Sequence, residues 1–230
     1  MAKTTLAAIT TDIRALMDYE NGTDADLDAL ILKTVNFALK RMKRYFLDAG
    51  MYDEIGAHDT FSTVASTEYV DISTETVDFD EAIILSERTN DKVIEIVSFA
   101  DYRAMFPDPS AQLSATPDAA AFFANRLYLG PTPSGVITLY LDYVKLITKL
   151  VSGDTLPFED KYDELVVAIS KEYLVSWLDM GNVNAVKMAR EHTKIVKHEL
   201  IVGAARNIGM NQQTQSRRGE IPYFSPRKVT

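Results

Sequence analysis

The sequence predicts an α+β protein in which an N-terminal and a C-terminal helix pair form one helical bundle. An inserted antiparallel β sub-domain is expected between the pairs, and an extended arm is expected at the C-terminus. Three observations predict this fold: apolar residues recur at helical spacing near both ends, short alternating segments occupy the middle, and the final residues follow neither period. The expected divisions are 1–47 and 148–205 for the bundle, 48–147 for the β sub-domain and 206–230 for the arm.

The composition limits the class of protein before any motif is considered. Hydrophobic residues make up 47% of the 230 residues, which is enough for a substantial core. The absence of cysteine excludes disulfides and thiolate metal sites. The N-terminus lacks the apolar stretch of a signal peptide and no apolar run approaches the roughly 20 residues that span a bilayer, so we expect no membrane association. A net charge of −9 argues against a surface built as a whole to hold DNA.

The N-terminal pair begins with a helix whose apolar residues keep helical spacing up to a break at Asn21-Gly22. The second helix is expected to begin at Thr23 or Asp24 and to run to about Leu47. Threonine is a good N-cap, and acidic residues in the first turn complement the helix dipole. The residues at helical spacing are Leu6, Ile9, Ile13 and Leu16 or Met17 on the first helix, and Leu27, Leu30, Ile31, Thr34, Phe37, Ala38, Met42 and Tyr45 on the apolar face of the second.

The central segment is acidic and rich in β-forming residues. Residues 48–91 hold twelve acidic residues against one arginine, Arg88. A turn at 88–91 predicts a hairpin, and Ser98 is expected to cap a short helix that ends at Met105. The predicted strands are 58–64, 68–72, 82–87, 92–97, 120–124, 126–129 and 136–144.

The C-terminal pair follows a loop at 152–154. A helix is expected from Pro157 to about Met180, because proline fits the first helical position and apolar residues then recur at helical spacing. A turn at Gly181-Asn182 separates it from a final helix over 183–205. Two long helices joined by so short a turn predict an antiparallel hairpin.

No pattern predicts a metal, a cofactor or a catalytic residue. The aspartates between Asp24 and Asp28 resemble the start of a calcium-binding loop, but Ala29 and Val35 occupy the positions that need glycine and glutamate. Helix capping is therefore the preferred interpretation. The chain's three histidines, and its many carboxylates, show no spacing that indicates a metal centre or an active site, and the expected set of catalytic and metal-binding residues is empty.

The arm combines basic residues with a short apolar anchor. Its five basic residues against the single acid Glu220 give +4, which leaves −13 on residues 1–205 for the net charge of −9. Alone, such a segment buries too little apolar surface to offset its chain entropy, so it is either an arm that orders on a partner or a loose terminus without a role. Its candidate contact residues are Arg217, Arg218, Ile221, Tyr223, Phe224, Arg227 and Lys228.

A basic stripe is predicted on the last helix, where Lys187, Arg190, Lys194 and Lys197 follow one another at spacings of three, four and three. Lys33, Lys40 and Arg44 form a second basic row on the second helix. Such a stripe binds phosphates, forms a solvated face, or pairs with acids on a neighbouring subunit, and the sequence leaves these three interpretations open.

The order of these parts resembles the head-to-tail connector adaptors of tailed bacteriophages, also called gatekeeper or tail-tubular proteins. The resemblance depends on Leu127-Tyr-Leu-Gly-Pro-Thr-Pro133, on a strand ending in Leu139-Tyr-Leu-Asp-Tyr143, and on Leu156-Pro-Phe-Glu-Asp-Lys-Tyr162 opening a long helix. Asn36-Phe-Ala38 in the second helix also fits. The resemblance covers most of residues 5–205, and the order of parts carries it more than any single motif.

The resemblance implies a structural protein and not an enzyme. Such adaptors form a dodecameric ring beneath the portal protein, with the C-terminal arm on the portal and tail or nozzle proteins on the opposite side. It therefore implies a virion protein of the head–tail junction, made in the host bacterial cytoplasm, with neighbouring copies of itself as partners and double-stranded DNA passing through. The family suggests only the arm; the docking residues within it are those named above, with Tyr223 and Phe224 as the expected buried anchors.

Two other functions compete with this interpretation. An independent module that binds nucleic acid without sequence preference would use the basic stripe and the arm on DNA. A hydrolase would use carboxylates of the acidic β sub-domain. Neither function has a motif in the sequence that supports it.

Overall fold

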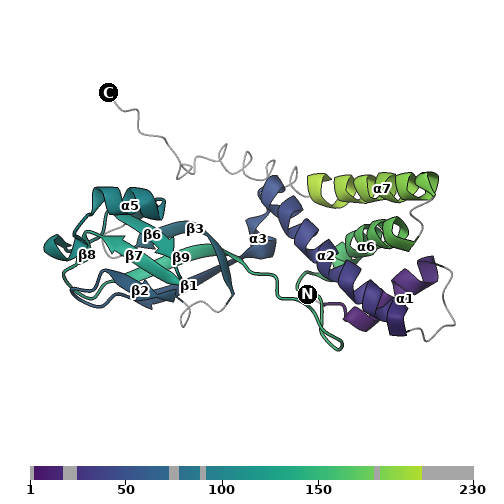
Figure 1. Cartoon of the computed structure of the whole chain (residues 1–230), viewed down its shortest axis with the longest axis horizontal. Helices are drawn as coiled ribbons and strands as arrows, with labels where there is room; N and C mark the ends of the chain where they lie inside the picture. Colours follow the sequence, from purple (N-terminus) through teal and green to yellow (C-terminus); the bar gives the residue numbers. More distant parts are fainter. Residues whose placement is uncertain (1–2, 18–24, 73–77, 89–91, 179–181, 204–230) are drawn as a thin grey trace, which may run out of the picture. The chain divides into compact units, whose positions relative to one another are not determined.

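The computed structural model describes residues 3–17, 25–72, 78–88, 92–178 and 182–203, and it confirms the α+β fold class (Figure 1). The chain divides into two compact units. The helical unit comprises Met1–Glu54 and Lys149–Thr230, and the β unit comprises Ile55–Thr148. Expected features outside the described residues are the Asn21-Gly22 break, the cap at Thr23 or Asp24, residues 89–91 of the hairpin turn, Gly181, and the arm at 206–230.

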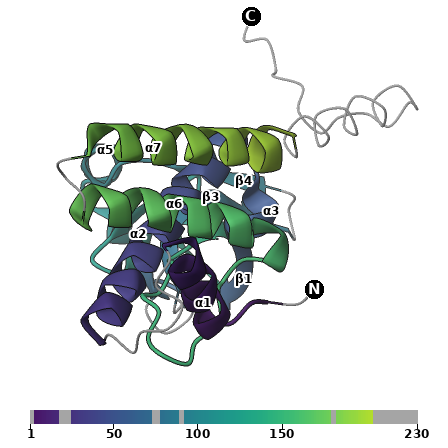
Figure 2. The same cartoon turned by 90° about the vertical axis from the view of Figure 1, so that its right-hand side faces the viewer.

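The helical unit is built around one central helix. α6 contacts α1, α2 and α7, and Figure 2 shows α7 lying beside it. α6 is apolar on nearly all sides, which is typical of a helix enclosed by others. The elements of this unit are α1 (Leu6–Leu16), α2 (Ala25–Ala49), α3 (Tyr52–Ile55), a 3-10 turn (Asp160–Tyr162), α6 (Asp163–Leu178), α7 (Val183–Lys197) and a π-helical turn (His198–Val202).

Side-chain caps fix where two of these helices begin. The Thr5 hydroxyl accepts a hydrogen bond from the Ala8 N–H at the start of α1, at 3.3 Å. The Asn182 side chain accepts one from the Ala185 N–H at the start of α7, at 3.1 Å. Each cap satisfies a backbone donor that has no partner within its helix.

The aspartates of the calcium-loop-like segment lie at a helix start. α2 begins at Ala25, and Asp26 and Asp28 lie in its first turn, where the helix dipole favours negative charge. Ala29 and Val35 lie within the same helix. The preference for a helix start over a calcium loop agrees with this structure.

α6 begins at Asp163, six residues later than the position predicted from Pro157. The intervening residues form a bend and then the 3-10 turn, in which the Tyr162 N–H donates to the Glu159 carbonyl at 3.0 Å. Just before Pro157 the chain pairs with the N-terminal segment, because the Leu6 N–H donates to the Asp154 carbonyl and the Leu156 N–H donates to the Thr4 carbonyl, both at 2.9 Å.

The predicted antiparallel hairpin of α6 and α7 is joined by a buried hydroxyl. Thr193 is 1% exposed, and its hydroxyl lies within hydrogen-bond distance of the Ala168 carbonyl on α6, at 3.2 Å, and of the Ala189 carbonyl on α7, at 3.1 Å. The final helix, expected over about 183–205, keeps α-helical geometry from Val183 to Lys197 and continues through the π-helical turn to residue 203, the last described residue.

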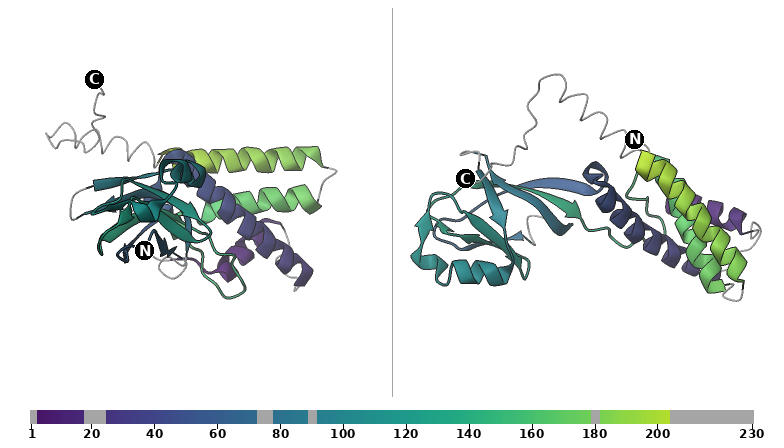
Figure 3. Two further views of the ribbon diagram at one scale, coloured as in Figure 1. Left: turned by 60° about the vertical axis from the view of Figure 1, so that its left-hand side comes forward. Right: turned by 90° about the horizontal axis from the view of Figure 1, so that it is seen from above.

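The β unit contains a curled sheet of seven strands in the order β1-β9-β3-β4-β6-β7-β2 (Figure 3). The expectation of a wholly antiparallel sheet is wrong in one respect, because β4 and β6 pair in parallel. Their connection carries α5 and a 3-10 turn, which makes it long enough to cross over the sheet. The elements are β1 (Gly56–Ser62), β2 (Tyr69–Asp71), β3 (Phe79–Glu87), β4 (Lys92–Ile96), α5 (Phe99–Met105), a 3-10 turn (Pro109–Ala111), β5 (Leu113–Ser114), β6 (Ala119–Phe123), β7 (Arg126–Gly130), β8 (Thr132–Pro133) and β9 (Thr138–Lys145).

α5 covers part of the sheet through a small aromatic core. Ser98 caps this helix, as predicted, by accepting from the Asp101 N–H. Tyr102 is fully buried, and its hydroxyl donates to the Leu129 carbonyl at 3.1 Å. Burial, reinforced by the nearby Glu68 carboxylate, raises the pKa of Tyr102 to about 12, so this donor keeps its proton at neutral pH. Phe106, Ala119, Ala121 and Tyr128 complete the cluster.

Candidate docking surfaces

The predicted basic stripe is partly engaged within its own subunit. Lys194 donates to Glu191 one turn away at 2.8 Å, and the Lys197 ammonium lies 3.8 Å from the centre of the Tyr45 ring on α2. Only part of the stripe's charge is therefore directed to solvent. The structure places all four of its residues on α7, with Lys197 half-buried and the other three exposed: Lys187, Arg190, Lys194 and Lys197.

A buried carboxylate joins three helices behind this stripe. Glu172 on α6 is 8% exposed, and its two oxygens face different arginines. Arg41 on α2 contacts one oxygen at 2.9 Å, and Arg190 on α7 approaches the other at 3.7 Å. Burial acts to lower the pKa of Arg41, but Tyr45 and Glu172 outweigh it and raise that pKa. Arg41 therefore stays charged and ties α2 to α6, while Arg190 remains largely exposed.

A second basic surface, which we call the lysine groove, lies along α2. It is a groove of about 420 Å³. Three of its lining residues are lysines and none is acidic, so the groove has an uncompensated cationic lining. The lining residues are Ala29, Leu32, Lys33, Asn36, Phe37, Lys40 and Lys149.

Asn36 brings the two parts of the lysine groove together. Its side-chain oxygen accepts from the Leu150 N–H at 2.7 Å, and its amide nitrogen lies 3.2 Å from the Leu150 carbonyl. This pairing holds the neighbouring Lys149 beside Lys33 and Lys40, from which it is distant in sequence. Sequence spacing predicts the basic row of Lys33 and Lys40 on α2. It does not predict Lys149, because only the fold brings this residue to the groove.

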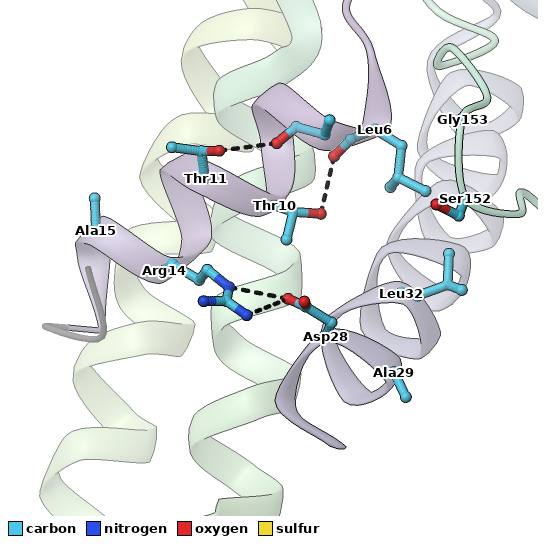
Figure 4. Close-up of a pocket in the computed structure, with 11 residues that line it drawn as sticks. Leu6, Thr10, Thr11, Arg14, Ala15, Asp28, Ala29, Leu32, Ser152 and Gly153 are labelled. Atoms are coloured by element: carbon cyan, nitrogen blue, oxygen red, sulfur yellow. Dashed lines mark hydrogen bonds and ion pairs between the residues drawn. The ribbon is translucent and has the colours of Figure 1, made fainter. Parts of the chain in front are cut away.

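Another groove of the helical unit lies between α1 and α2 (Figure 4). It measures about 700 Å³, and small or apolar side chains form most of its lining. The hydroxyls of Thr10 and Thr11 bond to carbonyls of their own helix. Arg14 directs two nitrogens at one oxygen of Asp28, at 2.9 and 2.6 Å. The polar side chains of Thr10, Thr11, Arg14 and Asp28 therefore form hydrogen bonds within the helices that line this groove.

A third groove, of about 380 Å³, lies among α1, α6 and α7. Its rim carries two of the exposed apolar side chains of the helical unit, Leu16 and Met188. Lys171 and His192 are its charged or titratable lining residues. Grooves of this kind suit contact with another protein, since apolar surface gains free energy when it leaves water.

The β unit carries carboxylates on both faces of strands β1, β3 and β9. On one face the Tyr143 hydroxyl lies 2.7 Å from Asp78 and 2.9 Å from Asp59, and burial together with these contacts raises the pKa of Tyr143. Asp142 follows Leu141 and precedes Tyr143, both buried, so its exposed side chain points to the opposite face. We define the acidic surface by the exposed residues Asp80, Glu81 and Asp142 on the neighbouring strands β3 and β9.

The described part of the chain offers no group of histidine, cysteine or acidic residues arranged to hold a metal ion. Within the same residues, no helix has the length and apolar character needed to cross a membrane. All seven predicted portal-docking residues lie outside the described residues: Arg217, Arg218, Ile221, Tyr223, Phe224, Arg227 and Lys228.

No curated protein matches the chain. Residues 4–193 match the profile of the SU10 adaptor protein family. The chain belongs to the SU10 adaptor protein family. This is a phage head–tail adaptor family, so the protein is a phage adaptor and a structural component of the virion.

The family match defines which surfaces belong to the shared SU10 adaptor fold. It includes the whole β unit and the lysine groove, and it ends within α7. Lys187 and Arg190 lie inside the matched range, whereas Lys194, Lys197 and the arm lie beyond it. The surfaces of the two folded units are therefore the part of this chain that the family likeness covers.

Proposed function

We propose that this SU10 adaptor forms a dodecameric ring beneath the portal, joins the DNA-filled head to the tail, and lines part of the channel through which the genome leaves. The match over 4–193 is the observation that carries the proposal. Its partners would be the portal, neighbouring copies and tail or nozzle proteins, and it would be made in the host cytoplasm and assembled at the head–tail junction. No step of this function requires a cofactor or a covalent reaction.

In this proposal the C-terminal arm provides the portal contact. Arginine forms paired hydrogen bonds with carboxylates, and Tyr223 and Phe224 supply apolar area at low entropic cost. A ring presents many identical arms, so a weak single contact becomes a durable attachment once several arms are engaged. The net charge of −9 suits a channel wall, because phosphate binding needs clustered lysine and arginine.

Deletion of residues 211–230 tests the arm directly. The shortened chain is expected to keep its helical circular dichroism and its cooperative unfolding, because the truncation begins beyond the described helices. It is expected to lose binding to portal rings, measured by co-sedimentation at physiological salt. Binding by the truncated chain at full-length affinity would show that another surface makes the contact.

Two substitutions within the arm separate burial from charge. Replacing Tyr223 and Phe224 by alanine is expected to weaken portal binding by about 2 kcal/mol or more, as loss of buried aromatic anchors does. Lys228→Ala serves as the control and is expected to cost less than about 1 kcal/mol, since an exposed charge contributes little. Equal losses would indicate that charge dominates the contact.

The competing function is binding of nucleic acid without sequence preference, and the lysine groove gives it a specific observation. In that case the full chain would bind duplex DNA with an affinity that falls steeply with salt. It would also stay monomeric in the presence of portal rings. Both results together would replace the adaptor mechanism proposed here.

A further inference from the structure

Charge is divided unequally between the two units. The β unit contains fourteen acidic and five basic residues, which gives it a net charge of −9. The whole chain also carries −9, so the helical unit with its arm sums to zero. The helical unit nevertheless holds a groove with three lysines and no acid in its lining. Each copy therefore presents a cationic groove on one unit and an excess of carboxylates on the other.

The lysine groove has an apolar centre as well as charge. Phe37 is 39% exposed and packs against the rings of Tyr173 and Trp177, at centroid distances of 5.7 and 5.8 Å. The Lys33 ammonium lies 5.1 Å from the centre of the Trp177 ring, so one lysine is already oriented by an aromatic neighbour. A partly exposed aromatic side chain that its neighbours hold in place can serve as the anchor of a protein contact, and the surrounding lysines favour an acidic partner.

Two kinds of anion match such a groove, the phosphates of DNA and the carboxylates of a protein. The chain's overall negative charge opposes approach to DNA. The exposed Phe37 gains little from a duplex backbone, whereas a protein surface would bury it. The carboxylate source present at equal stoichiometry is another copy of the β unit, whose acidic surface has exposed residues on the neighbouring strands β3 and β9.

We propose that the lysine groove of one copy binds the acidic surface of the β unit in a second copy. This inference rests on the proposed ring and specifies its interface. The contact joins two different surfaces, so every copy offers one groove and one acidic surface. A contact of this type repeats from copy to copy and ends only when a ring closes. Opposite charges at the contact also favour the correct orientation during association.

Charge exchange between the two surfaces tests the proposal with full-length protein. The double variant Lys33→Glu/Lys40→Glu and the double variant Glu81→Lys/Asp142→Lys are each expected to lose self-association by about tenfold or more, as close like charges do. Mixed at equal concentration, the two variants are expected to associate, because a reversed groove then meets a reversed acidic surface. Sedimentation velocity, and the number of copies bound per portal ring, provide the measurements.

The control variant is Lys3→Glu/Arg44→Glu, which makes the same change in charge at exposed positions outside the groove. It is expected to associate like the unmodified chain. Zero-length carbodiimide cross-linking of isotopically mixed copies gives a second readout. It is expected to join Lys33, Lys40 or Lys149 of one copy to Glu81 or Asp142 of another. Links between copies that avoid these residues would place the interface elsewhere.

The outcomes separate this inference from the proposed function. Suppose that the unmodified chain binds portal rings. If both charge variants then self-associate as it does, or if mixing the two variants does not restore association, the proposed groove–acidic-surface interface is wrong and the adaptor function remains. If the groove variant loses binding to a duplex oligonucleotide while self-association is unchanged, the groove holds phosphate and the proposal fails. If the unmodified chain neither binds portals nor associates, the proposed function fails first.

Discussion

At the scale of single residues, Gly130 shows how close packing selects glycine. This residue ends β7 in the β unit. A Cβ atom at Gly130 would lie 2.4 to 2.8 Å from three ring atoms of Phe106, which is itself buried. Phe106 belongs to the aromatic cluster under α5, so its ring has little room to move.

Gly130→Ala is therefore expected to lower the free energy of unfolding by about 1 to 3 kcal/mol, the usual cost of overpacking a core. Urea unfolding followed by circular dichroism measures the effect. Gly135→Ala is the matched control, because a Cβ there would meet no atom within 4 Å. The same unfolding midpoint for both variants would mean that the Phe106 ring moves aside without cost.

At the scale of elements, Asn36 on α2 forms hydrogen bonds with the segment that follows the β unit in the sequence. It contacts both backbone groups of Leu150, and its amide nitrogen also donates to the Leu32 carbonyl at 2.9 Å. A backbone group that loses such a partner but stays shielded from water is desolvated without a compensating hydrogen bond, which destabilises the folded state. Asn36 thus stabilises the helical unit and positions Lys149 in the lysine groove.

Asn36→Ala is expected to destabilise the helical unit by about 1 to 3 kcal/mol. Fluorescence of Trp177, the only tryptophan, follows urea unfolding of this unit alone. Asn184→Ala on the exposed side of α7 serves as the control and is expected to leave the midpoint nearly unchanged. An unaltered midpoint for Asn36→Ala would show that the Leu150 contact contributes nothing.

The elements that sequence patterns predicted well are those governed by local chemistry. Helical spacing and capping residues located α1, α2, α5 and α7, and alternation located most strands. Features set by distant contacts were not predictable. Residues 154–156 pair with the N-terminal segment, and the crossover through α5 makes the β4–β6 pair parallel. Lys149 reaches the groove through a distant contact as well, and Asn36, a polar residue on a mostly apolar helix face, was the only sequence signal of it.

At the scale of the whole molecule, the β unit is an insertion into a helical unit whose two halves pack on each other. α2 contacts α6 through Arg41 with Glu172, and it contacts the 3-10 turn before α6 through the edge-on packing of Phe46 on Tyr162 at 4.9 Å. Glu54 also accepts from Lys161 at 2.7 Å and from Tyr162 at 2.8 Å. These contacts lie wholly within the helical unit, so we propose that it folds without the insertion.

Replacement of residues 56–148 by a glycine-serine linker of about ten residues is expected to give a folded all-helical protein, since flexible linkers of this length close the gap at small entropic cost. Circular dichroism and a cooperative loss of Trp177 fluorescence on heating are the measurements. The same shortened chain with Phe46→Asp is the control and is expected not to fold, because Phe46 is fully buried. A shortened chain without a cooperative transition would show that the bundle depends on the insertion.

The chain passes between the units twice, once after Glu54 and once before Lys149. A single protease cut in any loop of the β unit therefore leaves two fragments that each still hold a share of the bundle. One fragment keeps α1 and α2, and the other keeps α6 and α7. We expect a nicked chain to migrate as two bands in denaturing gels and as a single particle in native ones, so that the ring proposed above would keep each subunit after a cut in a loop of its β unit.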